Sequence, residues 1–315
     1  MSTPTAGPPV TAAGSSAPFL SVENLVVEYH GHGGTFRAVD NVSFSVNRGE
    51  TLAVVGESGC GKSTIAKAIV RLLKPTSGRI VVDGTDIAAM PEKQLRPLRH
   101  RVQMIFQDPY GSLDPHQTAE EIVCEPLRVR GMKSAADRRK EAGRLIDRVG
   151  LPETALERRP PEFSGGQRQR IGIARALASR PDLLVCDEAT SALDVSVQAQ
   201  VLELLHEIQA ETGLTYVFIS HNLAVVREIS STVMVMRAGQ LVESGYTAMV
   251  LAAPQQTYTR ALRRAALDPA TMIGLKPRHL LAKAVVPEKA PELVDAGRAD
   301  PVLDGNPTDI EGALS

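Results

Sequence analysis

A glycine-rich segment near the start of the chain has the residue types and spacing of a phosphate-binding loop. Residues 56–63 read GESGCGKS, which matches the pattern G-x-x-x-x-G-K-[ST]. Glycines allow consecutive backbone N–H groups to face one chain of phosphates. Lys62 would then reach the β- and γ-phosphates of ATP, and the Ser63 hydroxyl would hold Mg²⁺. We expect ATP to contact residues Gly56, Glu57, Ser58, Gly59, Cys60, Gly61, Lys62, Ser63 and Thr64.

Two acidic residues end a strongly apolar segment, LLVCDE at positions 183–188. We expect Asp187 to bind Mg²⁺ through its water shell, as an acidic residue at the end of the neighbouring strand does in P-loop ATPases. Glu188 is then placed to orient or deprotonate the attacking water. Acidic residues at a strand end are often only solvated, but the four apolar residues before them and the upstream loop favour a catalytic role.

The segment 161–177, PEFSGGQRQRIGIARAL, contains a second candidate anion site. Ser164, Gly165, Gly166 and Gln167 offer a hydroxyl, two small residues and the start of a helix. One chain has no need of two such sites for one nucleotide. The segment resembles the signature motif of ABC ATPases. This resemblance implies that two ATPase chains pack head to tail, with each nucleotide between one chain's phosphate loop and the other chain's signature.

Other positions resemble ABC ATPase elements in the expected order. Gln107, after VQMIF, resembles the glutamine that contacts Mg²⁺ and links the nucleotide site to a helical insertion. His221, after TYVFIS, resembles the switch histidine that contacts the γ-phosphate. Ser191–Asp194 (SALD) resembles the loop that crosses to the opposite subunit, and Tyr29 stands where the family keeps an aromatic residue that stacks on adenine.

Three segments, VGESGCGKST, FQDPYGSLDP and EFSGGQRQRIGIARAL, resemble the ATPases of dipeptide and oligopeptide importers. That resemblance implies hydrolysis of ATP at the cytoplasmic face of the cell membrane. It also implies three kinds of partner: a second ATPase chain, identical or homologous, two transmembrane permeases and an extracytoplasmic solute-binding protein. Nickel or glutathione importers, a soluble ABC ATPase without transport, and a regulatory ATP-binding protein are the alternatives. The family's His-Pro-Tyr-Thr element is Gln256-Thr257-Tyr258-Thr259 here, which leaves the transported solute open.

The elements that must position these residues can be read from the hydropathy pattern. TLAVV at 51–55, LLVCD and TYVFIS have the continuous apolar character of strands covered on both faces. Residues 63–73 are expected to form a helix that stops at Lys74–Pro75. Val197, Val201, Leu204 and Ile208 fall on one face of another helix. We therefore predict an α/β fold, a P-loop NTPase core of the RecA-like type with an antiparallel β subdomain and a helical subdomain.

Composition and hydropathy suggest the domain limits. Residues 1–18 are rich in Pro, Ala, Ser, Thr and Gly and are expected to be disordered. The ATPase domain is predicted to span 19–262, with the helical subdomain at about 114–181. A largely flexible extension would follow at 263–315. Lys and Arg number 35 against 36 Asp and Glu, so no basic excess indicates a nucleic-acid partner. No apolar run approaches the ~20 residues that cross a bilayer.

Overall fold

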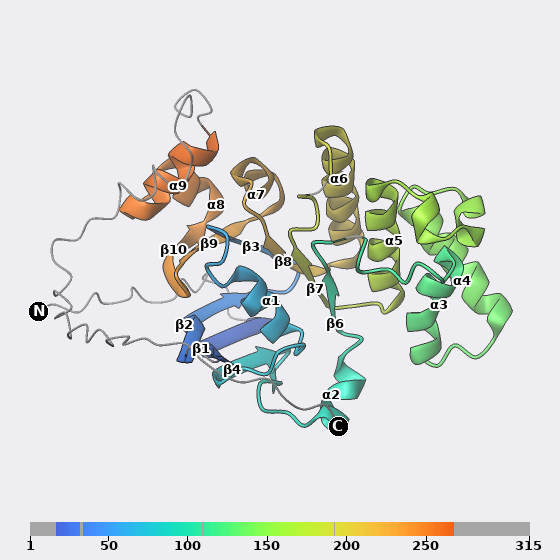
Figure 1. The fold of residues 1–315 in the computed structure, drawn as a ribbon, viewed down its shortest axis with the longest axis horizontal. Coiled ribbons are helices and arrows are strands. Elements are labelled where there is room, and N and C mark those ends of the chain that lie inside the picture. The colour runs from blue at the N-terminus through green and yellow to red at the C-terminus, as the bar shows by residue number, and fades with distance from the viewer. Residues whose placement is uncertain (1–16, 32–33, 109, 192, 268–315) are drawn as a thin grey trace, which may run out of the picture. The chain divides into compact units, whose positions relative to one another are not determined.

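The computed structural model describes residues 17–31, 34–108, 110–191 and 193–267. In these residues the strands form two sheets (Figure 1). The four-stranded sheet is antiparallel with the order β2-β1-β4-β5, and the six-stranded sheet has the order β10-β9-β3-β8-β7-β6. All neighbours in the larger sheet are parallel except β10 and β9. The strands are β1 (Leu20–Gly31), β2 (Gly34–Val46), β3 (Thr51–Gly56), β4 (Ser77–Val82), β5 (Thr85–Asp86), β6 (Val102–Ile105), β7 (Leu183–Asp187), β8 (Thr215–Ile219), β9 (Thr232–Arg237) and β10 (Gln240–Tyr246).

Helices connect the strands and cover both faces of the larger sheet. The buried apolar residues of these helices pack against the sheet or against neighbouring helices and form separate apolar clusters. The α-helices are α1 (Lys62–Ile69), α2 (Glu92–Leu95), α3 (Ala119–Val129), α4 (Ala135–Arg148), α5 (Gly165–Ala178), α6 (Val195–Thr212), α7 (Leu223–Ile229), α8 (Thr247–Ala252) and α9 (Thr257–Leu267). Three short 3₁₀ helices, η1 (Arg96–Leu98), η2 (Glu153–Glu157) and η3 (Pro160–Glu162), complete the described elements.

The parallel strands are buried on both faces, as their continuous apolar sequences predict. In β3, Leu52 and Val54 join the core shared with α1 and the four-stranded sheet. The alternate residues Ala53 and Val55 join the core shared with α7, α8 and α9. Because side chains alternate across a strand, an unbroken apolar run is what a strand between two cores needs. The parallel order also brings the carboxyl ends of β3, β6, β7 and β8 to one edge of the sheet.

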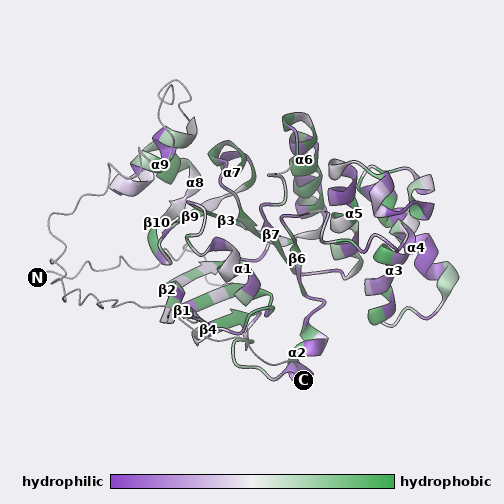
Figure 2. Ribbon diagram, viewed as in Figure 1, coloured by the Kyte–Doolittle hydropathy of each residue, from purple (hydrophilic) through white to green (hydrophobic). Residues whose placement is uncertain are grey.

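The four-stranded sheet is half buried, which agrees with the apolar–polar alternation of VDNVSFSV. Val39, Val42, Phe44 and Val46 of β2 are buried, whereas the polar residues between them are not. Figure 2 shows this as green bands alternating with paler ones along these strands. β1 and β2 form a hairpin in which Gly31 pairs with Gly34. The sequence HGHGG at 30–34 indicates a turn here, and its residues 32 and 33 lie outside the described part of the chain.

The segment between β6 and β7 is helical. From residue 114 to residue 181 the structure has α3, α4, η2, η3 and α5 and no strand. Buried residues of α3, α4, α5 and α6 share one apolar cluster with the faces of β7 and β8 that point toward it. On α6 the predicted face is present, since Val201, Leu204 and Ile208 are buried and Val197 packs against the same cluster. Figure 1 shows α3, α4 and α5 gathered together, on the side of β6 away from β3.

Helix α1 is shorter than the sequence indicates. It ends at Ile69, before the predicted stop at Lys74–Pro75. Arg71 has a left-handed backbone with φ of 54°, which an α-helix cannot continue through. The Arg71 guanidinium donates to the carbonyl oxygens of Ile87 (2.7 Å) and Met90 (3.1 Å). These contacts are distant in sequence, so the local helical pattern gives no sign of the early end.

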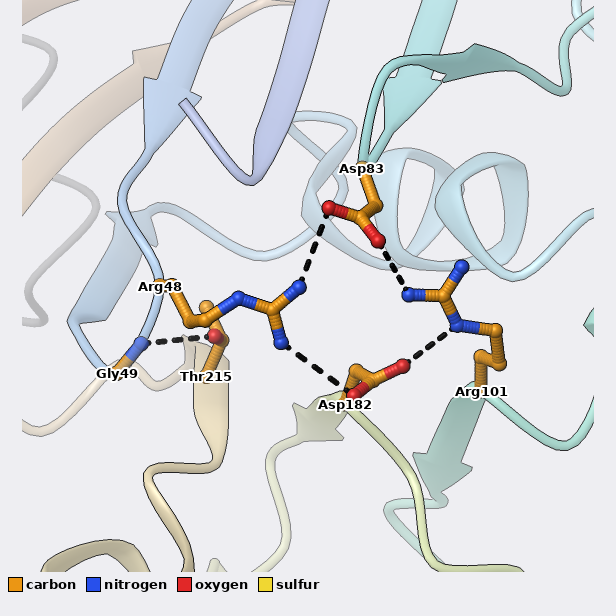
Figure 3. Close-up of polar contacts among 6 residues, drawn as sticks. All are labelled: Arg48, Gly49, Asp83, Arg101, Asp182 and Thr215. Carbon is orange, nitrogen blue, oxygen red and sulfur yellow. Dashed lines mark hydrogen bonds and ion pairs between the residues drawn. The ribbon is translucent and has the colours of Figure 1, made fainter. Parts of the chain in front are cut away.

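Four charged residues form a closed ring of ion pairs between the two sheets (Figure 3). Arg101, before β6, contacts Asp83 and Asp182 at 2.6 Å each. Arg48, between β2 and β3, contacts the same two carboxylates at 3.2 and 3.4 Å. The Arg101 hydrogen bond holds the pKa of Asp83 below its usual value. Asp83 belongs to the turn between β4 and β5, so the ring fastens the smaller sheet to the start of the larger one.

Helix α9 runs to Leu267, through the boundary that we placed between residues 262 and 263. Residues 1–16 and 268–315, which include most of the predicted disordered segment and of the flexible extension, lie outside the described residues. No helix among the described residues combines the length and hydrophobicity needed to cross a membrane.

Candidate nucleotide-binding site

The predicted phosphate loop lies between β3 and α1, where the sequence places it. Three of its glycines have positive φ angles, 152° at Gly56, 80° at Gly59 and 104° at Gly61. A Cβ atom at Gly56 would overlap the carbonyl oxygen of Met236, and one at Gly61 would overlap that of Ala38. These positions therefore need glycine both for the backbone angle and for close packing on β9 and β2. The resulting loop leads directly into the N-terminus of α1, which is suited to an anion.

Lys62 is the first residue of α1 and is 5% exposed. Its Nζ donates to the carbonyl oxygens of Gly56 (2.9 Å) and Glu57 (2.7 Å), and lies 3.9 Å from the Cys60 sulfur. A buried ammonium group needs such acceptors. Burial raises the pKa of the Cys60 thiol, so this cysteine is a packed, protonated neighbour. The structure thus holds one positive charge inside the curve of the loop.

Ser63 and Asp187 lie next to each other, although they are distant in sequence. The Ser63 hydroxyl donates to Asp187 Oδ1 at 3.0 Å. Burial raises the pKa of Asp187, and the Ser63 hydrogen bond opposes that shift. No group of three or more His, Cys, Asp or Glu suited to a metal occurs among the described residues. Two neighbouring oxygen donors fit Mg²⁺, which commonly takes one or two protein ligands and completes its shell with phosphates and water.

Glu188, the next residue, connects two other candidates. Its Oε2 accepts a 2.9 Å hydrogen bond from Gln107 Nε2 and lies 3.4 Å from His221 Nδ1. The three residues follow β6, β7 and β8, which are neighbours in the sheet, so the same edge collects them. Glu188 has a left-handed backbone, φ 48°, and its N–H donates to the Ile219 carbonyl of β8. With this backbone conformation, the Glu188 carboxylate points toward Gln107 and His221, whereas the Asp187 carboxylate contacts Ser63.

The signature segment forms the start of α5, as predicted. Ser164 caps the helix: its hydroxyl accepts from the Gln167 N–H, and the Gln167 side chain accepts from the Ser164 N–H. Gly166 packs on α6, where an added Cβ would lie 2.5 Å from a methyl group of Val197. Among the described residues, no hydrogen bond joins Ser164–Gln167 to the phosphate loop or to Glu188.

The remaining candidates lie on the surface. Tyr29 of β1 is 43% exposed and is paired across the hairpin with Phe36 of β2, which is 62% exposed. Phe36 is not among the residues predicted from the sequence, although a turn at 30–34 implies its pairing with Tyr29 and could have identified it. Asp194 caps α6 through the Val197 N–H, and the Ser191 hydroxyl donates to the Glu188 carbonyl oxygen. Residue 192 of this loop lies outside the described residues.

The QTYT element at 256–259 also contacts the phosphate loop, a contact that the sequence does not predict. Gln256 and Thr257, the two positions that differ from the family's element, are exposed. Tyr258 and Thr259, the two that agree with it, are 5% and 2% exposed. The Glu57 N–H donates to the Tyr258 hydroxyl at 3.3 Å. The substitutions therefore leave the buried half of the element unchanged.

Comparisons with known proteins identify the family. The family model for the ABC transporter matches residues 39–191. A probable peptide ABC transporter ATP-binding protein of Sinorhizobium fredii is 51% identical, over 79% of this chain and 73% of that protein. The oligopeptide transport ATP-binding protein AppF of Bacillus subtilis is 46% identical, over 82% and 78%.

A solved structure is similar as well. The ATP-binding cassette MJ0796, in a dimeric post-hydrolysis state bound to ADP and Pi, superposes with a TM-score of 0.68 and 31% identity. The similarity covers 72% of this chain and 98% of that one, and it confirms the predicted fold class. With half of the aligned sequence identical to a curated relative over most of its length, this chain belongs to the family of ABC transporter ATP-binding proteins.

Proposed function

We propose that this chain binds ATP with Mg²⁺ at the edge formed by β3, β6, β7 and β8, hydrolyses it, and thereby powers an importer of dipeptides or oligopeptides. One observation carries the proposal. Beside the Ser63–Asp187 pair, Glu188 accepts a hydrogen bond from Gln107 and lies 3.4 Å from His221. A nucleotide-binding protein without turnover has no need of a carboxylate held at that position.

Each residue has a definable task in this reaction. Lys62 neutralises charge on the β- and γ-phosphates, which it can do because its present partners are uncharged carbonyl groups. Ser63 and Asp187 hold Mg²⁺, with Gln107 as a further oxygen ligand. Bound Mg²⁺ supplies charge neutralisation at the phosphates. Glu188 aligns the attacking water or accepts its proton, and His221, 3.4 Å from that carboxylate, would contact the γ-phosphate.

The second half of the nucleotide site comes from another ATPase chain, identical or homologous to this one. Two observations support this. The Ser164–Gln167 segment is a candidate anion site at a helix start, and among the described residues it makes no hydrogen bond to the phosphate loop of its own chain. The similar cassette MJ0796 is described as dimeric. ATP would then join the two chains, and hydrolysis would separate them.

The transported solute is inferred from the relatives. Both relatives compared above are named for peptide or oligopeptide transport. A glutathione import ATP-binding protein, GsiA of Salmonella paratyphi A, is 46% identical over 86% of this chain and 44% of that protein, so glutathione is the alternative that a comparison favours. The partners would be two transmembrane permeases and an extracytoplasmic solute-binding protein, with this chain at the cytoplasmic face of the membrane.

Lys62→Ala tests the site, and Lys74→Ala, a loss of the same charge at an exposed position after α1, is the control. A charge-assisted hydrogen bond contributes about 1.5–3 kcal/mol, so ATP affinity should fall at least about tenfold in Lys62→Ala alone. Equal affinity in all three proteins would remove this loop from the proposed site. Uptake of labelled dipeptide, glutathione and nickel by cells with and without the chain then identifies the solute. Unchanged dipeptide uptake without the chain would contradict peptide import.

A further inference from the structure

The hydroxyl of Tyr258 contacts the phosphate loop from a distant part of the chain. Tyr258 lies in the first turn of α9 and is 5% exposed. Its ring belongs to the apolar cluster that includes Ala53 and Val55 of β3, the strand that leads into the loop. From this position the hydroxyl accepts the Glu57 N–H at 3.3 Å. A tyrosine that only filled the core would not need to end at a backbone donor of the loop.

The contact matters because of which peptide group it involves. The Glu57 N–H and the Gly56 carbonyl belong to one planar peptide unit, so they turn together. On the carbonyl side, Gly56 O accepts the Lys62 ammonium at 2.9 Å. Tyr258 and Lys62 therefore hold opposite ends of the same peptide. A rotation of this peptide that broke one hydrogen bond would break the other, and successive hydrogen bonds of this kind polarise one another.

The tyrosine itself is held in place. Glu243 of β10 accepts from the N–H groups of Gln255 (2.8 Å) and Gln256 (3.1 Å), immediately before α9. The Arg237 guanidinium lies 5.2 Å from the centre of the Tyr258 ring. Burial raises the pKa of Tyr258 to about 12, so the hydroxyl is neutral at physiological pH and adds no negative charge beside the phosphates.

We propose that Tyr258 is a positioning residue for Lys62, acting through the Gly56–Glu57 peptide, so that α9 forms part of the nucleotide site. This inference depends on the proposed ATP site. Tyr258 would contact neither the nucleotide nor the water that attacks the γ-phosphate. Its effect is to fix the peptide that orients the lysine, and hence the affinity for the phosphates.

Tyr258→Phe is the direct test, since it removes the acceptor and keeps the ring in the core. Tyr246→Phe, the same change at a tyrosine that is 49% exposed, is the matched control. We expect ATP affinity, measured by titration calorimetry well below the melting temperature, to fall about threefold to tenfold in Tyr258→Phe only, the effect of one hydrogen bond. The kcat at saturating ATP should stay within about twofold, so the KM should rise in parallel with the dissociation constant.

Two results would overturn the inference. A Tyr258→Phe protein that melts at a lower temperature but binds ATP as the wild type does would assign the hydroxyl to stability alone. A fall in kcat with unchanged affinity would also exclude a role in binding. Failure of the wild-type chain to bind ATP would instead refute the proposed function, so the two failures can be told apart.

Discussion

Replacing Glu188 by Gln separates the chemical step from nucleotide binding. The glutamine has the same shape, and its amide oxygen can still accept the Gln107 hydrogen bond that Glu188 now accepts at 2.9 Å. Unlike the carboxylate, the amide cannot accept a proton from water, and it carries no negative charge. The change therefore tests whether this position acts in the reaction or only in the fold.

The structure allows both effects to be estimated. Because the Gln107 contact can persist and the backbone is unaltered, the free energy of unfolding should change by less than about 0.5 kcal/mol. Loss of a positioned acid–base group lowers turnover by about 10²–10⁴-fold, which raises the barrier by about 3–5 kcal/mol. The charge of Glu188 is one of the causes that raise the pKa of Asp187, after burial. Its removal lets Asp187 ionise more easily, so ATP affinity should be kept or increased.

Three measurements on purified protein decide the outcome. Phosphate release gives turnover, titration calorimetry gives ATP affinity, and size-exclusion chromatography with Mg²⁺-ATP reports the dimer. We expect Glu188→Gln to accumulate as an ATP-bound dimer, with itself or with its partner chain. Adding Ser164→Arg should dissolve that dimer by placing bulk and charge at the second anion site. Hydrolysis at the wild-type rate in Glu188→Gln would refute the assignment of this carboxylate.

Gly61→Ala should weaken ATP binding at least about tenfold, because its Cβ would overlap the Ala38 carbonyl at a backbone φ of 104°; unchanged affinity would contradict this account of the loop. Arg101→Ala should lower the free energy of unfolding in urea by about 1–2 kcal/mol at pH 7. Asp83 has a depressed pKa, so this difference should shrink as the pH falls below about 4, and a constant difference would exclude the ion pair as its source. We expect the stretch Asp108–Pro115, which follows Gln107 and leads to the helical insertion, to dock on a permease. Tyr110→Ala in this stretch should then reduce solute uptake by cells and leave basal ATP hydrolysis within about twofold. Parallel loss of both would argue against coupling there.

Much of the fold and part of the site could be predicted from the sequence because the responsible interactions are local. The glycines and lysine of the phosphate loop are consecutive, and the loop adopts its form between its own strand and helix. The strands β3, β7 and β8 are buried on both faces, and their unbroken apolar sequences predict this burial. Ser164 caps α5 with Gln167, three residues later, so this motif too is recognisable within one turn.

Contacts between distant residues were decided by the tertiary structure. Gln107 meets Glu188 because β6 lies beside β7, and the order β10-β9-β3-β8-β7-β6 differs from the order along the chain. Family resemblance suggested that these residues act together, but hydropathy carries no information about which parallel strands become neighbours. The early end of α1 depends likewise on the carbonyl groups of residues 87 and 90.

The contact of Tyr258 with Glu57 shows the limit most clearly, since 201 positions separate the two residues. In the sequence, Tyr258 falls on the apolar face of a short amphipathic helix, and no neighbouring residue indicates that its hydroxyl contacts the phosphate loop. The hydroxyl reaches the Glu57 N–H because α9 packs against the apolar cluster that includes Ala53 and Val55 of β3. Local sequence determined that a phosphate loop would form here, and long-range packing decided which side chains hold it in position.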